Sequence, residues 1–231
     1  MKFYPKILNV LAVFVIVSTM TSCEAGPAKN IATDKTLAAN NSDPSNAALA
    51  GNSAKDANPA VTSPGKPFSK TLELHGIKFV VESPNSATGN TVKVTPSGLE
   101  VSNDVQTRSV NGEVYDAEVG DLNIDLSPEI YIYVRETGGN KKASLIAYSA
   151  NKKRSLSEIA IPEVDTKSKE FAGYNGGDEF AVVESTLARR FPIYDGSGAD
   201  AKKTGKMRQL KYKLKQGEAM WQLTIAGSTE F

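Results

Sequence analysis

The sequence predicts an all-β fold, an antiparallel β-sandwich or barrel-like domain that follows a disordered tether. Three observations support this prediction. From residue 69 onward, short runs alternate apolar and polar residues as β-strands do. Turn-forming Gly, Pro and Asn residues separate these runs. No long amphipathic helical pattern occurs among them, and many short strands with frequent turns are typical of sandwiches and barrels.

The first half of the domain contains six strand-like runs. They cover residues 71–74, 77–82, 91–95, 99–101, 105–110 and 114–119. Pro96-Ser97-Gly98 is a turn signal that ends the third run. Asn111-Gly112 suits a two-residue hairpin, because both residues tolerate positive φ. The last two runs are therefore predicted to form a hairpin.

The second half contains the strongest strand signals. Residues 130–134 are the most strand-like run, and residues 144–149 are the natural partner strand. Further strands are predicted at residues 180–184, 187–194, 207–214 and 221–225. In the strand predicted at residues 207–214, alternation places the side chains on two faces. One face carries Leu210, Tyr212 and Leu214, and the other carries Lys211, Lys213 and the following Lys215.

The first 22 residues have the pattern of a lipoprotein signal peptide. Lys2 and Lys6 begin it, and an apolar run too short to span a bilayer comfortably follows. The segment Met20-Thr21-Ser22-Cys23 resembles a bacterial lipobox, with Met20 where Leu is usual. That resemblance implies lipidation of Cys23. The alternative is a cysteine that happens to follow an ordinary signal peptide.

Residues 23–68 are predicted to be a lipidated, disordered linker. They are rich in Ala, Asn, Ser, Pro and Gly and contain few large apolar residues. Such a segment cannot bury enough surface to offset the entropy of ordering it. We predict a flexible tether between the lipid anchor and the folded domain, residues 69–231.

Composition excludes several functional classes. The chain has 27 Lys and Arg residues against 26 Asp and Glu residues, so a nucleic-acid partner is disfavoured. One Cys and one His, His75, exclude a disulfide framework, a cysteine zinc cluster and a multi-histidine metal site within one chain. No Gly-x-Ser-x-Gly motif occurs, and nothing selects a catalytic carboxylate pair. We therefore predict that the protein is not an enzyme.

A group of acidic residues precedes the strand at residues 130–134. Asp121, Asn123 and Asp125 alternate, with Glu129 nearby, and alternating oxygen ligands on a turn can bind Ca²⁺. An EF-hand loop has Gly at its sixth position and Glu at its twelfth, where this sequence has Leu126 and Ile132. Asp and Asn also favour turns by bonding their own backbone. We predict a turn and no metal or other cofactor, and leave cation binding by this group open.

The loop between the two strongest strands is a further candidate site. Gly138 and Gly139 predict a flexible base, and Asn140, Lys141 and Lys142 form a polar tip. A projecting loop of this kind is suited to entering the cleft of a partner. An ordinary solvated turn is the alternative.

A resemblance to a known family favours the partner-binding interpretation of this loop. The motifs SPEIYIYV and SLIAYSAN are among the segments that carry it, at residues 96–100, 121–123, 127–134, 144–151, 155–159, 177–184, 189–194 and 207–214. Together these segments resemble the bacterial periplasmic inhibitors of invertebrate-type (I-type) lysozyme. The resemblance implies a secreted, all-β, non-enzymatic homodimer that blocks lysozyme with a loop in its active-site cleft.

That resemblance assigns lysozyme binding to Gly138, Gly139, Asn140, Lys141 and Lys142. The family's loop carries a Ser-Gly-x-Tyr motif, whereas this loop lacks both the Ser and the Tyr. The two lysines would instead pair with the catalytic carboxylates of lysozyme. Together with the lipobox, the resemblance predicts a periplasmic protein anchored to the outer membrane by its lipid. The alternative function is an envelope lipoprotein, a binding or structural module that keeps the fold without inhibiting lysozyme.

Overall fold

The computed structural model describes residues 65–231, so the signal peptide, Cys23 and nearly all of the predicted tether lie outside the described residues. The described residues form twelve strands, β1 Phe68–Leu74, β2 Ile77–Ser83, β3 Thr91–Ser97, β4 Gln106–Ser109, β5 Glu113–Gly120, β6 Glu129–Arg135, β7 Ala143–Ser149, β8 Ser157–Glu158, β9 Glu179–Val183, β10 Thr186–Asp195, β11 Lys202–Gln216 and β12 Trp221–Glu230. Three short 3₁₀ helices accompany them, η1 Asn151–Lys153, η2 Lys169–Phe171 and η3 Gly198–Asp200. No helix in the described part of the chain is long and apolar enough to cross a membrane.

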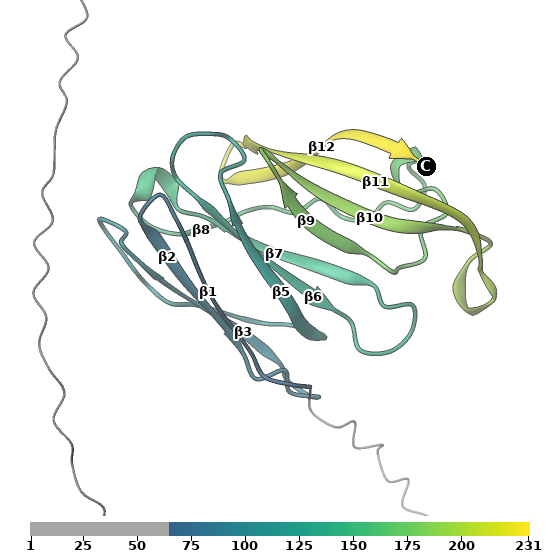
Figure 1. Ribbon diagram of the computed structural model, residues 1–231, viewed down its shortest axis with the longest axis horizontal. Coiled ribbons are helices and arrows are strands. Elements are labelled where there is room, and N and C mark those ends of the chain that lie inside the picture. Colours follow the sequence, from purple (N-terminus) through teal and green to yellow (C-terminus); the bar gives the residue numbers. More distant parts are fainter. Residues whose placement is uncertain (1–64) are drawn as a thin grey trace, which may run out of the picture. The chain divides into compact units, whose positions relative to one another are not determined.

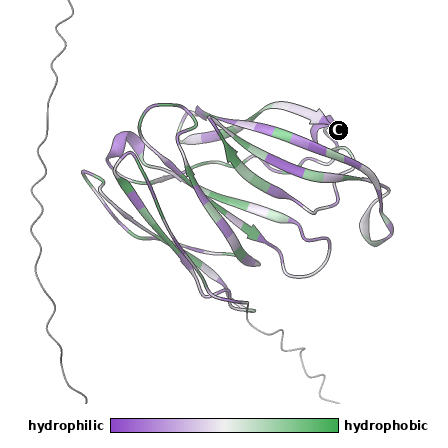
Figure 2. Cartoon of the chain, viewed as in Figure 1, coloured by the Kyte–Doolittle hydropathy of each residue, from purple (hydrophilic) through white to green (hydrophobic). Residues whose placement is uncertain are grey.

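The strands form three antiparallel sheets of four strands each (Figure 1). Their orders are β1-β2-β3-β4, β5-β6-β7-β8 and β9-β10-β11-β12. Hydrophobic residues occur on the strands of all three sheets (Figure 2). The predicted all-β, antiparallel fold is confirmed.

The sheet β5-β6-β7-β8 is the middle layer, because it contributes to two hydrophobic cores. On β6, Ile130, Ile132 and Val134 pack into the core shared with the first sheet. The intervening Tyr131 and Tyr133 pack into the core shared with the third sheet. Alternation in this strand therefore divides aliphatic from aromatic residues, and both faces are buried.

The predicted pairing of residues 130–134 with residues 144–149 is confirmed. β6 and β7 pair along their whole length, from Glu129 opposite Ser149 to Arg135 opposite Ala143. The two-faced pattern predicted for residues 207–214 is also confirmed. Its apolar side chains, Leu210, Tyr212 and Leu214, are buried, and its lysines, Lys211, Lys213 and Lys215, are exposed.

The predicted hairpin around Asn111-Gly112 is wrong. β4 pairs with β3, and β5 pairs with β6, so this turn carries the chain from the first sheet to the second. The Nδ2 atom of Asn90 donates a hydrogen bond to the Gly112 carbonyl oxygen at 2.7 Å and holds the crossing in place. Residues 99–101 are not a strand either, because Glu100 and Val101 donate their backbone N–H groups to the turn at η1.

Candidate functional site

The predicted lysozyme-binding loop, residues 138–142, connects β6 to β7 at one end of the middle sheet, and we call it the β6–β7 loop. All five of its residues are exposed. In Figure 1 the loop projects beyond the ends of the two strands. The backbone N–H of Glu136 donates to the Lys142 carbonyl oxygen at 2.8 Å and closes its base. The structure therefore places the predicted residues together on an accessible projection.

The segment before β9 contacts the β6–β7 loop. The Nδ2 atom of Asn140 donates to Oδ1 of Asn175 at 2.8 Å, and the N–H of Gly177 donates to the Lys141 carbonyl oxygen at 3.2 Å. A Cβ atom at Gly176 would collide with the carbonyl oxygen of Asn140. The absence of a side chain at this residue thus permits the close approach of the two segments.

The two glycines at the base of the loop have a left-handed backbone conformation. Gly138 and Gly139 have φ values of +88° and +57°, which lie in the left-handed region that favours glycine. Lys141 also has a positive φ, +51°, a conformation that non-glycine residues adopt only where their surroundings hold them. The two glycines therefore suit the positive φ values that this turn requires, and the residues after them, Asn140 and Lys141, contact the second segment.

A buried ion pair fixes the point where the loop enters β7. Oδ2 of Asp178 accepts hydrogen bonds from the Ala143 N–H at 3.0 Å and from the Tyr174 hydroxyl at 2.7 Å. Oδ1 of Asp178 accepts from Nε of Arg189 at 2.7 Å. The side chains of the pair are 0% and 6% exposed. Asp178 therefore links the loop to the core of the third sheet.

Aromatic rings surround the guanidinium group of Arg189. Its Cζ atom lies 5.1 Å from the ring centres of Phe171 and Tyr174 and 5.3 Å from that of Phe180. Burial by itself would lower the pKa of Arg189, but the Asp178 carboxylate and the neighbouring tyrosines outweigh it and raise the pKa. The arginine therefore stays charged, and the loss of either partner would leave an isolated charge in the interior.

Sequence reasoning did not assign Asn175, Asp178 or Arg189 to a site. A signal for Arg189 is present, because Leu187, Arg189 and Phe191 fall on one face of β10, and all three are buried. An arginine on an apolar face predicts a buried partner of opposite charge. Nothing local identifies Asp178 as that partner.

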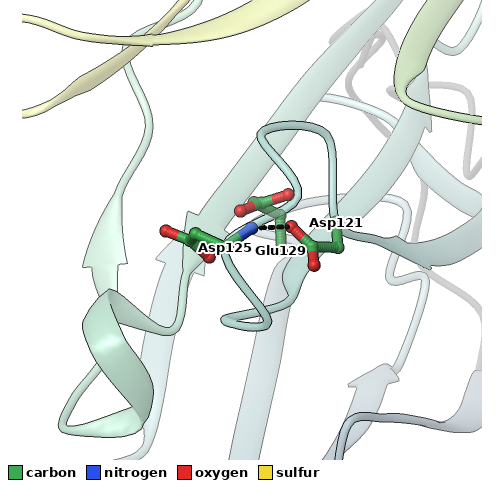
Figure 3. A group of neighbouring side chains, drawn as sticks. All are labelled: Asp121, Asp125 and Glu129. Atoms are coloured by element: carbon green, nitrogen blue, oxygen red, sulfur yellow. Dashed lines mark hydrogen bonds between the residues drawn. The ribbon is translucent and has the colours of Figure 1, made fainter. Parts of the chain in front are cut away.

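The acidic group predicted as a turn lies between β5 and β6. Ligand oxygens of Asp121, Asp125 and Glu129 lie within 4.8 Å of one another, and Figure 3 shows the three side chains at one loop. The carboxylate of Asp121 accepts from the Asp125 N–H at 3.0 Å and from the Leu126 N–H at 2.9 Å. These bonds close the turn, as Asp side chains commonly do.

Glu129 is the buried member of this acidic group. Its exposed fraction is 0%. Oε2 accepts from the Leu122 N–H at 2.8 Å, whereas Oε1 has no hydrogen-bond partner among the described residues. Burial and, to a lesser extent, the charges of Asp121 and Asp125 raise the pKa of Glu129, the Leu122 hydrogen bond lowers it, and the net pKa is about 8.

His75 lies in the turn between β1 and β2 and faces the same acidic group. Its Nε2 atom is 3.3 Å from Oδ2 of Asp121. This contact links the first sheet to the β5–β6 connection. The single histidine of the chain is thus placed beside a carboxylate that takes part in a turn.

No protein-family model matches the chain, and no curated protein matches it. The resemblance to inhibitors of I-type lysozyme therefore stays a prediction that depends on the segments that carry it. Lipidation of Cys23 also stays a prediction, since that residue lies outside the described part of the chain.

Proposed function

We propose that this protein binds I-type lysozyme and inhibits it by inserting the β6–β7 loop into the active-site cleft. The observation that supports the proposal is a projecting tip with two adjacent cationic side chains. Lys141 and Lys142 are exposed, and neither forms an ion pair with any residue from 65 to 231. Both ammonium groups are available to a partner.

The chemistry of the target supports this choice of partner. Lysozymes cleave a glycosidic bond of the substrate, and two carboxyl groups of the enzyme flank this bond in the active-site cleft. Ammonium groups form charge-assisted hydrogen bonds with carboxylates, and these strengthen where water is excluded. A loop that a second segment already holds loses less conformational entropy on binding. The two lysines thereby replace the Ser and Tyr of the family motif with ionic contacts.

The first test is a panel of lysozymes of several types. The purified protein is incubated with each immobilised enzyme, and the hydrolysis of cell-wall substrate is measured alongside. We expect binding and inhibition of the I-type enzyme, with inhibition severalfold weaker at about 0.3 M salt than at about 0.05 M, because salt screens the attraction that draws the two lysines toward the carboxylates before contact. Binding to no lysozyme would contradict the proposal and leave the alternative, an envelope module without inhibitory activity.

We also propose that Cys23 carries a lipid that anchors the protein to the outer membrane on its periplasmic side. The support is the lipobox-like segment Met20-Thr21-Ser22-Cys23, which contains the only cysteine of the chain. We expect Cys23→Ala to move the protein from the membrane fraction to the soluble fraction. The matched control is Ser22→Ala, which keeps a small residue before the cysteine and should stay in the membrane fraction. Membrane retention of Cys23→Ala equal to that of the parent would refute lipidation.

A further inference from the structure

The acidic loop before β6 contains two buried oxygen atoms that lack a hydrogen-bond partner. They are Oε1 of Glu129 and Oδ1 of Asn123, and neither is bonded to a described residue. Glu129 is fully buried, and its carboxyl group lies next to that of Asp121 (Figure 3). Buried polar atoms without partners are uncommon, and an ordered water or an ion commonly satisfies them. The unpartnered oxygen of the fully buried Glu129 therefore marks a place for such a group beside the other carboxylates.

The carboxyl groups of this loop form one ion-pair contact among the described residues, between Nε2 of His75 and Oδ2 of Asp121 at 3.3 Å. Asp121, Asp125 and Glu129 bring three carboxyl groups within 4.8 Å, and no Lys or Arg of residues 65–231 forms an ion pair with any of them. The buried Asp178, in contrast, has Arg189 at 2.7 Å. Converging carboxylates in a partly buried place repel one another unless a cation lies between them.

The donor atoms indicate which cation would fit. The converging atoms are carboxylate oxygens, the ligands of hard cations. Ca²⁺ accepts six to eight oxygen ligands in flexible arrangements, whereas Mg²⁺ requires near-octahedral geometry and keeps several waters. This loop offers several protein oxygens, and one of its carboxylates is fully buried. Such a site suits Ca²⁺ better than Mg²⁺.

The two departures from the EF-hand pattern do not prevent this loop from forming a sharp turn or from supplying a further carboxylate. Leu126 stands where glycine is usual, yet it adopts a φ of +64°, so the sharp turn forms without glycine. Ile132 stands where the last carboxylate is usual, but Glu129, three residues earlier, supplies a carboxylate to the group instead.

We propose that Asp121, Asp125 and Glu129 bind one Ca²⁺ ion in the loop between β5 and β6. The ion would neutralise the convergent carboxylates and supply a partner for the buried carboxyl group of Glu129. Glu129 and the β6–β7 loop lie at opposite ends of β6, about 20 Å apart. Calcium binding is therefore independent of lysozyme binding, and either proposal can fail without the other.

The test measures thermal unfolding and calcium binding of the purified protein after removal of metals with a chelator. At a calcium concentration about 100 times the Kd, we expect the melting temperature to rise by roughly 5–10 °C. Titration calorimetry should give one site with a Kd between about 10⁻⁵ and 10⁻³ M. Mg²⁺ at the same concentrations should raise the melting temperature much less. Failure of about 10 mM Ca²⁺ to shift the melting temperature would overturn the proposal, and an equal shift with Mg²⁺ would overturn the choice of calcium.

The first variant is Asp125→Asn, which keeps the shape of an exposed side chain and removes one ligand charge. We expect its calcium affinity to fall at least about tenfold. The matched control is Asp104→Asn, because the Asp104 side chain is exposed and its carboxylate bonds to no described residue. The control should bind calcium as the parent does. An Asp125→Asn protein with the parent's affinity would overturn the site.

The second variant, Glu129→Gln, separates loss of the ion from loss of the fold. Without calcium, this variant should fold and melt close to the temperature of the parent, since glutamine keeps the side-chain volume and can accept the hydrogen bond from the Leu122 N–H. Calcium should then shift its melting temperature little or not at all. If calcium stabilises the variant as much as it stabilises the parent, Glu129 is not a ligand and the proposal fails.

Discussion

Replacing Arg189 by Met is expected to lower the free energy of unfolding by about 3–5 kcal/mol, because it leaves Asp178 charged and unpaired in the interior. Asp178 is 0% exposed, and its Oδ1 would lose the bond from Nε of Arg189. For a domain of this size the melting temperature should fall by roughly 6–20 °C. Chemical denaturation followed by intrinsic fluorescence or circular dichroism measures the change.

The neighbouring arginine provides the matched control. Arg190 is exposed on the opposite face of β10, and its Nε atom bonds only to Gln209 at 2.6 Å among the described residues. Arg190→Met should cost less than about 1 kcal/mol. The double variant Arg189→Met/Asp178→Asn should recover part of the loss, because no isolated charge remains. Equal destabilisation by the two single arginine substitutions would contradict the importance of the buried pair.

Replacing Lys141 and Lys142 by Ala should raise the inhibition constant against I-type lysozyme at least about 100-fold. Each ammonium group that loses a desolvated carboxylate partner is expected to cost about 2 kcal/mol or more, and each 1.4 kcal/mol is a factor of ten. The fold should not change, since both side chains are exposed and the loop contacts use the Lys141 backbone and the Asn140 side chain. Inhibition assays and thermal melts of the same preparations measure both quantities.

A control of equal charge distinguishes loop chemistry from net charge. Lys211 and Lys213 are exposed on β11, and neither forms an ion pair with a described residue. The double variant Lys211→Ala/Lys213→Ala also removes two positive charges and should inhibit as the parent does. A loop variant that inhibits as strongly as the parent would show that the β6–β7 loop is not the inhibitory element.

The strand β6 illustrates how much of the fold the sequence predicted. Its run of Ile, Tyr and Val predicted a strand, and the polar loop after it predicted that the chain turns back to pair with the next strand, β7. The burial of both faces was not predicted. Ile132 and Tyr133 are both apolar enough to lie in a core. The sequence therefore does not show an alternation of apolar and polar residues, and it does not reveal that the two side chains enter different hydrophobic cores.

The connection at Asn111-Gly112 illustrates where local reasoning failed. Turn chemistry identified a turn correctly, but a turn does not determine which strands pair across it. The exposed β4 pairs with β3 in the first sheet, whereas Val114 and Ala117 of β5 enter the core between two sheets. The burial of β5 therefore decided the pairing.

The candidate sites, like the strands, were predicted in part from the sequence and in part seen only in the tertiary structure. The sequence identified the five residues of the β6–β7 loop and the acidic residues before β6, because each group lies within a few residues of chain. It could not supply Asn175 for the loop, because this partner lies 35 residues away from Asn140 in the sequence. Nor could it show that Glu129, unlike Asp125, is fully buried.

By itself, the sequence determined that this protein is built of β-strands and where most of them lie, since alternation and turn chemistry act over a few neighbouring residues. The tertiary structure alone decided the three-layer order of the sheets, the restraint of the β6–β7 loop and the pairing of Asp178 with Arg189. It also decided that one acidic side chain of the β5–β6 connection lies in the interior. These features depend on which distant segments exclude water from each other, and burial of that kind has no local signature.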